Sequence, residues 1–183
     1  MQKGLMILSD NCEDVEALAS IALLRRAGFE VTSATFNRFK EITTKFKQTV
    51  KVDETVQSID QAAFDFLVLP GGPYVDEVMG KTKALDALIK SFNDQGKLIA
   101  AICAAPRFLG ALGLLDGKVF TGFTGADIDA PKGLYHPEAE ALKDGNIITA
   151  RGAGVVYAFV YEITRALKDQ TAADQLMRAI RHV

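Results

Sequence analysis

The sequence contains few of the residues that build metal sites and disulfide frameworks. Its 183 residues include two cysteines, Cys12 and Cys103, and two histidines, His136 and His182. Two cysteines do not make a disulfide framework, and a reducing compartment keeps both as thiols. The four residues are not clustered at the spacing of zinc ligands, so we expect no structural zinc site.

Long hydrophobic runs and a bias of charge are also missing. No stretch approaches the roughly 18 apolar residues that a membrane-spanning helix requires. Residues 1–17 contain neither the apolar core nor the cleavage site of a signal peptide, so we expect a cytoplasmic protein without a membrane partner. The 21 basic and 23 acidic residues give a formal net charge of −2, which does not point to nucleic acid as a partner.

What the sequence does contain is enough apolar material for a sizeable core. Hydrophobic residues make up 49% of the chain, with 15 glycines and 5 prolines, which excludes a disordered or collagen-like protein. At about 150 residues per domain, residues 1–183 are expected to form one domain.

The first part of the chain has the pattern of a strand, a helix and a second strand. The short apolar run at residues 4–9 is typical of a strand buried on both faces. Asp10 or Asn11 is expected to cap a helix that ends at Gly28, and residues 30–36 predict a second strand. The expected buried face of the helix is Val15, Leu18, Ala19, Ala22 and Leu23. This order predicts a parallel βαβ unit.

The rest of the chain continues this alternation after an interruption. Residues 37–63 mix Thr, Val and Lys and predict short exposed strands or a hairpin at the edge of the sheet. Further strands are predicted at residues 64–69, 98–102, 119–121 and 147–150, and further helices at 85–92, 104–112, 155–168 and 172–181. The predicted fold class is α/β, with a mostly parallel sheet and helices on both faces.

Three predicted strand ends carry residues that could form a site. In open parallel sheets, ligands bind beyond the carboxyl ends of the strands. At those ends the sequence has residues 12–16 after the first strand, Gly71 and Gly72 after Leu69, and Cys103 after the strand at 98–102. We expect these three segments to converge.

Cys103 lies at a predicted strand-to-helix junction with small residues on both sides. A sharp turn there would present the thiol at the edge of the sheet, as in the nucleophile elbow of hydrolases. The N–H groups at the start of the following helix would favour the thiolate. The alternative is that Cys103 is a small buried hydrophobic residue, as most free cysteines are.

Glu16 and the two glycines are the candidates to act beside this thiol. Glu16 is expected to face inward with a raised pKa, as a proton donor or general base. The alternative for Glu16 is a solvated glutamate in the first helical turn, as expected for Glu13 and Asp14. Gly71 and Gly72 either donate N–H groups to an oxyanion or form an ordinary tight turn.

The remaining cysteine and the two histidines are weaker candidates for a functional role. Cys12 is expected in a polar loop, as an exposed thiol without a role. His136 lies in a predicted loop, where it is either a base or a surface residue. His182, beside the C-terminus, is not a candidate.

Five segments follow one another in an order that resembles a known family. They are the acidic turn CEDVEA, the helix end LLRRAGFEVT, the turn LVLPGG, the elbow IAAICAAP and the late segment DGNIITARGAG. They make residues 3–167 similar to the ThiJ/PfpI superfamily and, within it, to the DJ-one-like branch. The resemblance implies a flavodoxin-like α/β sandwich, usually a homodimer. It matches Cys103 to a reactive, low-pKa cysteine, Glu16 to a buried glutamic acid, and Gly72 with Ala104 to backbone donors at the sulfur.

The sequence departs from the family at its histidine. The peptidase branch has a histidine directly after the cysteine, where this chain has Ala104. The DJ-one-like branch has one at the end of the next strand, where this chain has TGFTG at residues 121–125. A Cys–His–acid mechanism therefore lacks its base unless His136 folds over the site, and peptidase activity is not expected.

Two functions remain. The resemblance points to glyoxalase or deglycase chemistry on methylglyoxal or its adducts, in which Cys103 attacks the carbonyl, Glu16 moves a proton and Gly72 holds the oxygen. That chemistry requires no metal or organic cofactor. The second function is an oxidative-stress sensor or chaperone that acts through oxidation of Cys103. Outside the family, a flavodoxin-like binding domain is disfavoured, because SDNCED after the first strand has no glycine for a phosphate loop.

Overall fold

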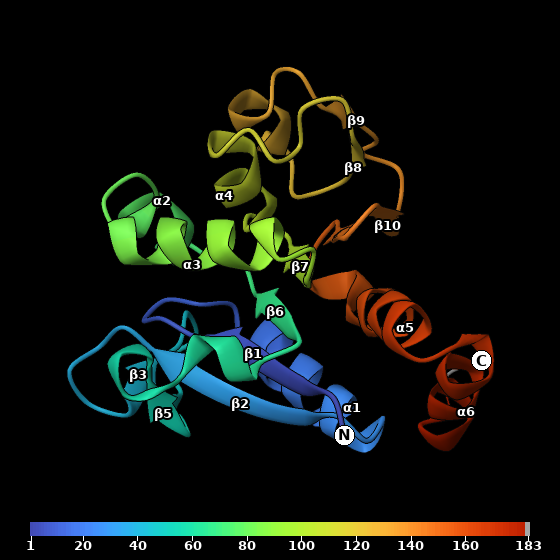
Figure 1. Ribbon diagram of the computed structural model, residues 1–183, viewed down its shortest axis with the longest axis horizontal. Helices are drawn as coiled ribbons and strands as arrows, with labels where there is room; N and C mark the ends of the chain where they lie inside the picture. Colours follow the sequence, from blue (N-terminus) through green and yellow to red (C-terminus); the bar gives the residue numbers. More distant parts are fainter. Residues whose placement is uncertain (182–183) are drawn as a thin grey trace.

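The fold is built on a seven-stranded sheet, as the computed structural model of residues 1–181 shows (Figure 1). In chain order the strands are β1 (Lys3–Ile7), β2 (Glu30–Thr35), β3 (Glu41–Thr43), β4 (Thr49–Lys51), β5 (Glu54–Thr55), β6 (Phe66–Leu69), β7 (Leu98–Ile102), β8 (Val119–Phe120), β9 (Leu134–Tyr135), β10 (Ala141–Asp144) and β11 (Ile147–Ala150). The main sheet has the order β10-β11-β7-β6-β1-β2-β5, and only β10 is antiparallel to its neighbour. The predicted mostly parallel sheet is confirmed, and His182 lies outside the described residues.

Helices cover both faces of this sheet (Figure 1). They are the π-helical turn η1 (Val15–Ala19), α1 (Ser20–Arg26), α2 (Tyr74–Val78), α3 (Lys83–Asp94), α4 (Pro106–Ala111), α5 (Val156–Leu167) and α6 (Gln170–Ala179), with 3₁₀ turns η2 (Val56–Ser58), η3 (Gln61–Ala63), η4 (Ala126–Asp129) and η5 (Ala153–Val155). On one face α1 and α5 contact each other, and on the other α3 packs against β6 and β7. Within residues 1–181, no helix has the length and apolar character needed to cross a lipid bilayer. The arrangement is the three-layer α/β sandwich that the sequence predicts.

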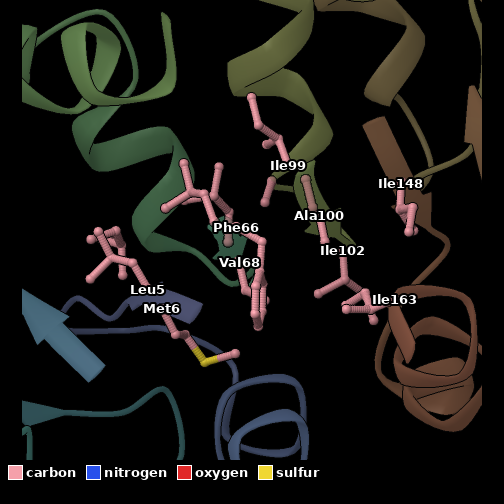
Figure 2. Packing of buried hydrophobic residues seen from close by; sticks show 14 of the residues in the cluster. Leu5, Met6, Phe66, Val68, Ile99, Ala100, Ile102, Ile148 and Ile163 are labelled. Atoms are coloured by element: carbon pink, nitrogen blue, oxygen red, sulfur yellow. The ribbon is translucent and has the colours of Figure 1, made fainter. Parts of the chain in front are cut away.

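Apolar side chains of the central strands fill the space between the layers (Figure 2). Met6, Phe66 and Ile102 come from three neighbouring strands and are fully buried. Ile163 of α5 lies beside Ile102, which ties the helix layer to the sheet (Figure 2). An added Cβ at Gly4 would lie 2.2 Å from the ring of Phe66, so glycine makes room for that ring. Each such buried side chain contributes about 1.5–3 kcal/mol of transfer free energy.

Some strands join the fold differently from the prediction. Residues 37–63 do contain a hairpin, but β3 and β4 form a separate antiparallel ribbon, and the edge of the main sheet is β5. The predicted strand at 119–121 is β8, which pairs with β9 instead of the main sheet. Next to β8 the Thr121 N–H donates to the side-chain Oγ1 of Thr149 on β11, at 2.9 Å. A side-chain oxygen is therefore the acceptor where a strand of the main sheet would use a backbone carbonyl. β10, with the sequence ALKD, lacks β-branched residues and was not predicted.

The first helix begins later than predicted and turns another face inward. The carboxylate of Asp10 accepts the Thr43 N–H at 2.7 Å, and Asn11 has a φ of +61°, so neither caps the helix. Val15 and Leu18 are 50% and 38% exposed. The wide π-helical turn η1 rotates the residues that follow it, which a regular 3.6-residue period does not anticipate. The buried face is Glu16, Ala17, Ser20, Leu23 and Leu24.

Candidate active site

The three strand ends singled out in the sequence do meet at one edge of the sheet. From β1 the chain proceeds to β2 on one side, and β6 and β7 then lie on the other side of β1. The loops that follow β1 and β6 therefore diverge at a topological switch point, where open α/β sheets bind ligands. Residues 12–16, the Gly71–Gly72 turn and Cys103 are in contact there.

Cys103 forms the sharp turn predicted for a nucleophile elbow. Its φ is +64°, a left-handed conformation that is strained for a residue with a side chain. Its N–H donates to the Ala150 carbonyl at 2.9 Å, and its carbonyl accepts the Phe123 N–H at 2.6 Å. Gly71 makes this turn possible, because an added Cβ there would lie 2.7 Å from the Cβ of Cys103. The thiol is partly exposed to the cleft described below.

Glu16 lies buried beside this thiol, as the sequence predicts. Its side chain is fully buried, and Oε2 accepts the Gly71 N–H at 2.8 Å. The carboxyl is also hydrogen-bonded to the Cys103 thiol. Within residues 1–181 the second oxygen, Oε1, has no partner. Burial raises the pKa of Glu16 to about 7, against the opposing effects of the thiol, the Gly71 N–H and Lys45.

The pKa of Cys103 shifts in the opposite direction to the prediction. Burial raises the pKa of the thiol, and so do the charge and hydrogen bond of Glu16, while the Ala104 N–H lowers it. The sequence argument considered the N–H groups after the strand but not the depth of the sulfur or the adjoining carboxyl. The helix itself, α4, begins only at Pro106 and has six residues. At neutral pH Cys103 is therefore held as a thiol, next to the carboxyl of Glu16.

Only part of the predicted set of backbone donors is available. The Gly71 N–H is held by Glu16, so its predicted role as an oxyanion donor is wrong. Gly72 has a φ of +121°, and within residues 1–181 its N–H has no acceptor. Gly72 and Ala104 both line the cleft around Cys103. They remain the candidates to bind a negative oxygen next to the sulfur.

The acidic turn before η1 is less exposed than predicted. Cys12 is fully buried, and burial raises the pKa of its thiol to about 12, so the expected exposed thiol is wrong. Its carbonyl accepts the Lys45 N–H from the β3–β4 hairpin, which covers it. Glu13 is 8% exposed and caps the turn, because its Oε2 accepts the Glu16 N–H at 2.8 Å. Asp14 accepts the Thr44 hydroxyl at 2.5 Å and so anchors the hairpin over the site.

The site opens into a cleft with two adjoining hollows of about 530 and 450 Å³. Both are lined by Glu13, Lys45, Cys103, Phe123 and Thr124. The larger hollow continues along Tyr135, Glu140 and the segment 151–155, and the smaller along Gly72, Asp76, Arg107 and Ile128. Together they offer enough room for a small carbonyl compound and part of a larger adduct.

The cations that line this cleft differ in their partners. Arg107 is held by Asp76 and Asp129, each at 2.5 Å, so its charge is balanced. Within residues 1–181, Lys45 and Arg151 form no ion pair. These two side chains therefore provide the free positive charge of the cleft.

The substitute base suggested for the missing histidine is not brought to the thiol. His136 does not line the cleft, and its Nδ1 lies 3.2 Å from the Glu138 carboxylate. The stretch 121–125, where the resemblance implied a histidine, does lie against Cys103, with Phe123 57% exposed at the cleft. Glu16 is therefore the titratable side chain that the structure shows hydrogen-bonded to the thiol.

Sequence reasoning did not single out several residues of the site. Arg151 lines the cleft, and its only signal in the sequence is that it belongs to the segment DGNIITARGAG, which carries part of the family resemblance. Lys45 lies on a hairpin far along the chain from β7, and nothing near it in the sequence indicated a site. Tyr74 is buried next to the Pro70–Gly72 turn, and the sequence pattern there indicates only a turn.

Comparison with known proteins identifies the family of this chain. The sequence model of the DJ-1/PfpI family matches residues 2–166. The protein dj-1beta of Drosophila melanogaster is 31% identical over 180 residues, 98% of this chain and 96% of its own length. A deglycase of Pyrococcus abyssi is 36% identical over 165 residues, 90% of this chain and 98% of its own.

Solved structures agree with this result. The crystal structure of Drosophila melanogaster DJ-1beta superposes with a TM-score of 0.92 at 30% identity, covering 100% of this chain and 98% of that one. A DJ-1 superfamily protein from Salmonella typhimurium also gives a TM-score of 0.92, at 29% identity, with 100% of both chains covered. With a family match over most of its length and relatives of this similarity, the chain belongs to the DJ-1/PfpI family.

Proposed function

We propose that this protein carries out glyoxalase or deglycase chemistry on methylglyoxal or its adducts, through Cys103 and Glu16. The observation that carries the proposal is the buried Glu16 carboxyl, with a pKa of about 7, hydrogen-bonded to a thiol that opens on a cleft. A general base works best when its pKa lies near the working pH. Several archaeal relatives bear the name deglycase, which supports this choice of chemistry.

In the first step the Cys103 sulfur adds to the aldehyde carbon of methylglyoxal. The S–H proton passes to the Glu16 carboxylate and from there to the new alkoxide, so a neutral hemithioacetal forms and Glu16 becomes a carboxylate again. The N–H groups of Gly72 and Ala104 stabilise the oxygen while it carries the negative charge.

In the second step Glu16 moves a proton between two carbons. It removes the proton from the carbon bonded to sulfur, which gives an enediolate, and returns it to the neighbouring carbon. The hydroxyl proton moves at the same time from the first oxygen to the second. The product is a lactate thioester on Cys103, which water hydrolyses to lactate and the free thiol. Methylglyoxal and water thus become lactate without an oxidant or reductant. With an adduct, Cys103 displaces the amine or thiol, which leaves with the proton that Glu16 received.

The test is methylglyoxal consumption and lactate formation by the purified protein without glutathione. Cys103→Ser is expected to abolish turnover, and Glu16→Gln to lower it by about 10²–10⁴-fold, the usual range for general acid–base catalysis. Cys12→Ala is the matched control, because it removes the other thiol, which is buried. Turnover that survives Cys103→Ser would refute the proposal.

A second candidate is an oxidative-stress sensor or chaperone, which the donors around the sulfur favour. Two peroxide molecules would transfer two oxygen atoms to Cys103, giving a sulfinate and two water molecules. In this candidate the sulfinate oxygens are held by protonated Glu16, which is hydrogen-bonded to Cys103, and by the Gly72 N–H, which lines the same cleft. This candidate predicts the mass of two added oxygen atoms on the Cys103 peptide after peroxide treatment. A wild-type protein that stays unoxidised there, or that turns over methylglyoxal, counts against it.

We also propose that the chain forms a homodimer. Three large apolar side chains are exposed on η1 and the β3–β4 hairpin: Val15, Leu18 and Phe46 are 50%, 38% and 60% exposed. Asp14 joins the two elements through Thr44, so these side chains lie on neighbouring parts of the surface. Sedimentation should show a dimer for the wild type and a monomer for Val15→Lys. A wild-type monomer at micromolar concentration would refute the dimer.

A further inference from the structure

Tyr74 is a buried polar residue that the proposed chemistry does not use. It begins α2, and its side chain is 1% exposed. The hydroxyl donates a hydrogen bond of 2.7 Å to the carbonyl of Pro70, and the ring packs against Phe108 with centroids 5.8 Å apart. Phe108 fixes the ring, so the hydroxyl is aimed at one acceptor.

That acceptor is connected to the active site through a single peptide unit. The carbonyl of Pro70 and the N–H of Gly71 belong to the same planar peptide group. At its other end the Gly71 N–H donates to Oε2 of Glu16 at 2.8 Å. Tyr74 and Glu16 therefore hold opposite ends of one peptide, in a chain of two hydrogen bonds that runs from a hydroxyl to a carboxyl. Such chains are cooperative, because each bond polarises the next.

We propose that Tyr74 is a positioning residue for Glu16. By holding the Pro70–Gly71 peptide in one orientation, it keeps the Gly71 N–H directed at Oε2 and favours the carboxylate, the form that accepts the proton of Cys103. This role rests on the proposed function, which assigns the proton transfer to Glu16. It is distinct from catalysis, since Tyr74 touches neither the cleft nor the thiol hydrogen bond.

The other groups that act on Glu16 come from three places around it. Glu13 lies in the loop before η1, Lys45 belongs to the β3–β4 hairpin, and Cys103 directly follows β7. Cys12, in the loop after β1, also lies near the pair and is held as a thiol by its raised pKa. Burial raises the pKa of Tyr74 well above its ordinary range, so the phenol stays neutral and its removal changes no charge. A shift caused by Tyr74→Phe would therefore come from the hydrogen bonds.

Tyr74→Phe keeps the ring and removes only the hydroxyl. The buried Pro70 carbonyl then loses its donor, and the peptide is free to turn away from Glu16. A carboxylate that is less stabilised has a higher pKa, so the titration of the Cys103–Glu16 pair should move upward. The expected shift is between about 0.3 pKa units, for lost polarisation alone, and about 2, for loss of the Gly71 hydrogen bond.

The experiment measures the rate of Cys103 alkylation by iodoacetamide as a function of pH. In the wild type the rate should rise in a step near pH 7, where the pair loses its first proton. A shift of one unit in Tyr74→Phe would lower the rate at pH 7 about fivefold. Tyr161→Phe is the control, because it removes a tyrosine hydroxyl that binds Asp174 on α6, away from this cleft. Its step should stay in place.

Two further arms make the outcome decisive. Glu16→Gln should abolish the step, and Tyr74→Phe added to it should then have no effect on the profile. 3-Fluorotyrosine at position 74 is nearly isosteric and a stronger donor, so it should shift the step downward even if Tyr74→Phe does not fold. A step that neither Tyr74→Phe nor 3-fluorotyrosine moves would overturn the role of Tyr74 alone. A wild type without any step near pH 7 would overturn both this role and the proposed proton transfer.

Discussion

Replacing Glu16 by glutamine should make the protein more stable while it disables the site. The side chain is fully buried, and its pKa is raised from 4.5 to about 7 in the folded state. A carboxyl with a raised pKa favours the unfolded chain wherever it would otherwise be ionised. At pH 8, where both states have lost the proton, this difference in pKa lowers the free energy of unfolding by about 3 kcal/mol. At pH 5 the folded state keeps its proton, and the free energy of unfolding is lowered by only about 1 kcal/mol.

Thermal unfolding at the two pH values checks this reasoning. For a chain of this length about 1 kcal/mol shifts Tm by roughly 2–4 °C, so Glu16→Gln should raise Tm by about 6–12 °C at pH 8 and by only about 2–4 °C at pH 5. Glu30→Gln, at an exposed position at the start of β2, is the control for the general effect of replacing a glutamate by glutamine. Equal shifts at pH 5 and pH 8 for Glu16→Gln would refute the raised pKa, and with it the proton transfer.

Three further changes test the surroundings of the pair. Gly71→Ala places a Cβ 2.7 Å from that of Cys103 and should lower the free energy of unfolding, measured by chemical denaturation, by about 1–3 kcal/mol. Gly154→Ala, whose Cβ would have no atom within 4 Å, should lower it by less than about 1 kcal/mol, and equal losses would contradict the close packing at Gly71. Lys45→Met removes a charge that lowers the pKa of Glu16, so the alkylation step should move to higher pH, and a downward move would argue against that contact. Cys12, fully buried, should be alkylated only after unfolding in urea, which peptide mass spectrometry would show.

The parts of the site that the sequence predicts are those with local signals. A strand, a cysteine and a run of small residues predict the turn at Cys103, and its φ of +64° confirms it. The local pattern names Glu16 as a candidate but leaves a buried and a solvated position open, and the π-helical turn η1 is what turns it inward. Convergence of the strand ends requires only the parallel topology, which the alternation of strands and helices indicates.

The parts that the sequence does not predict depend on contacts between distant segments. The burial of Cys12 is caused by a hairpin whose Lys45 donates to its carbonyl, and nothing around either residue indicates this contact. The use of the Gly71 N–H by Glu16 joins residues 55 positions apart. The direction of the Cys103 pKa shift depends on how deeply the sulfur lies and on what faces it. Periodicity and motif spacing contain none of this information.

The left-handed backbone at Cys103 has a consequence for how such a chain can change over generations. Glycine adopts that conformation without strain, whereas any residue with a side chain costs about 1–2 kcal/mol there. Glu16 also opposes folding, so Cys103→Gly and Glu16→Gln are both changes that inactivate the pair and remove a destabilising contribution. Thermodynamic stability alone would favour their loss. A lineage that no longer needed the thiol would gain robustness by losing it, and only selection for its chemistry would keep cysteine at this turn.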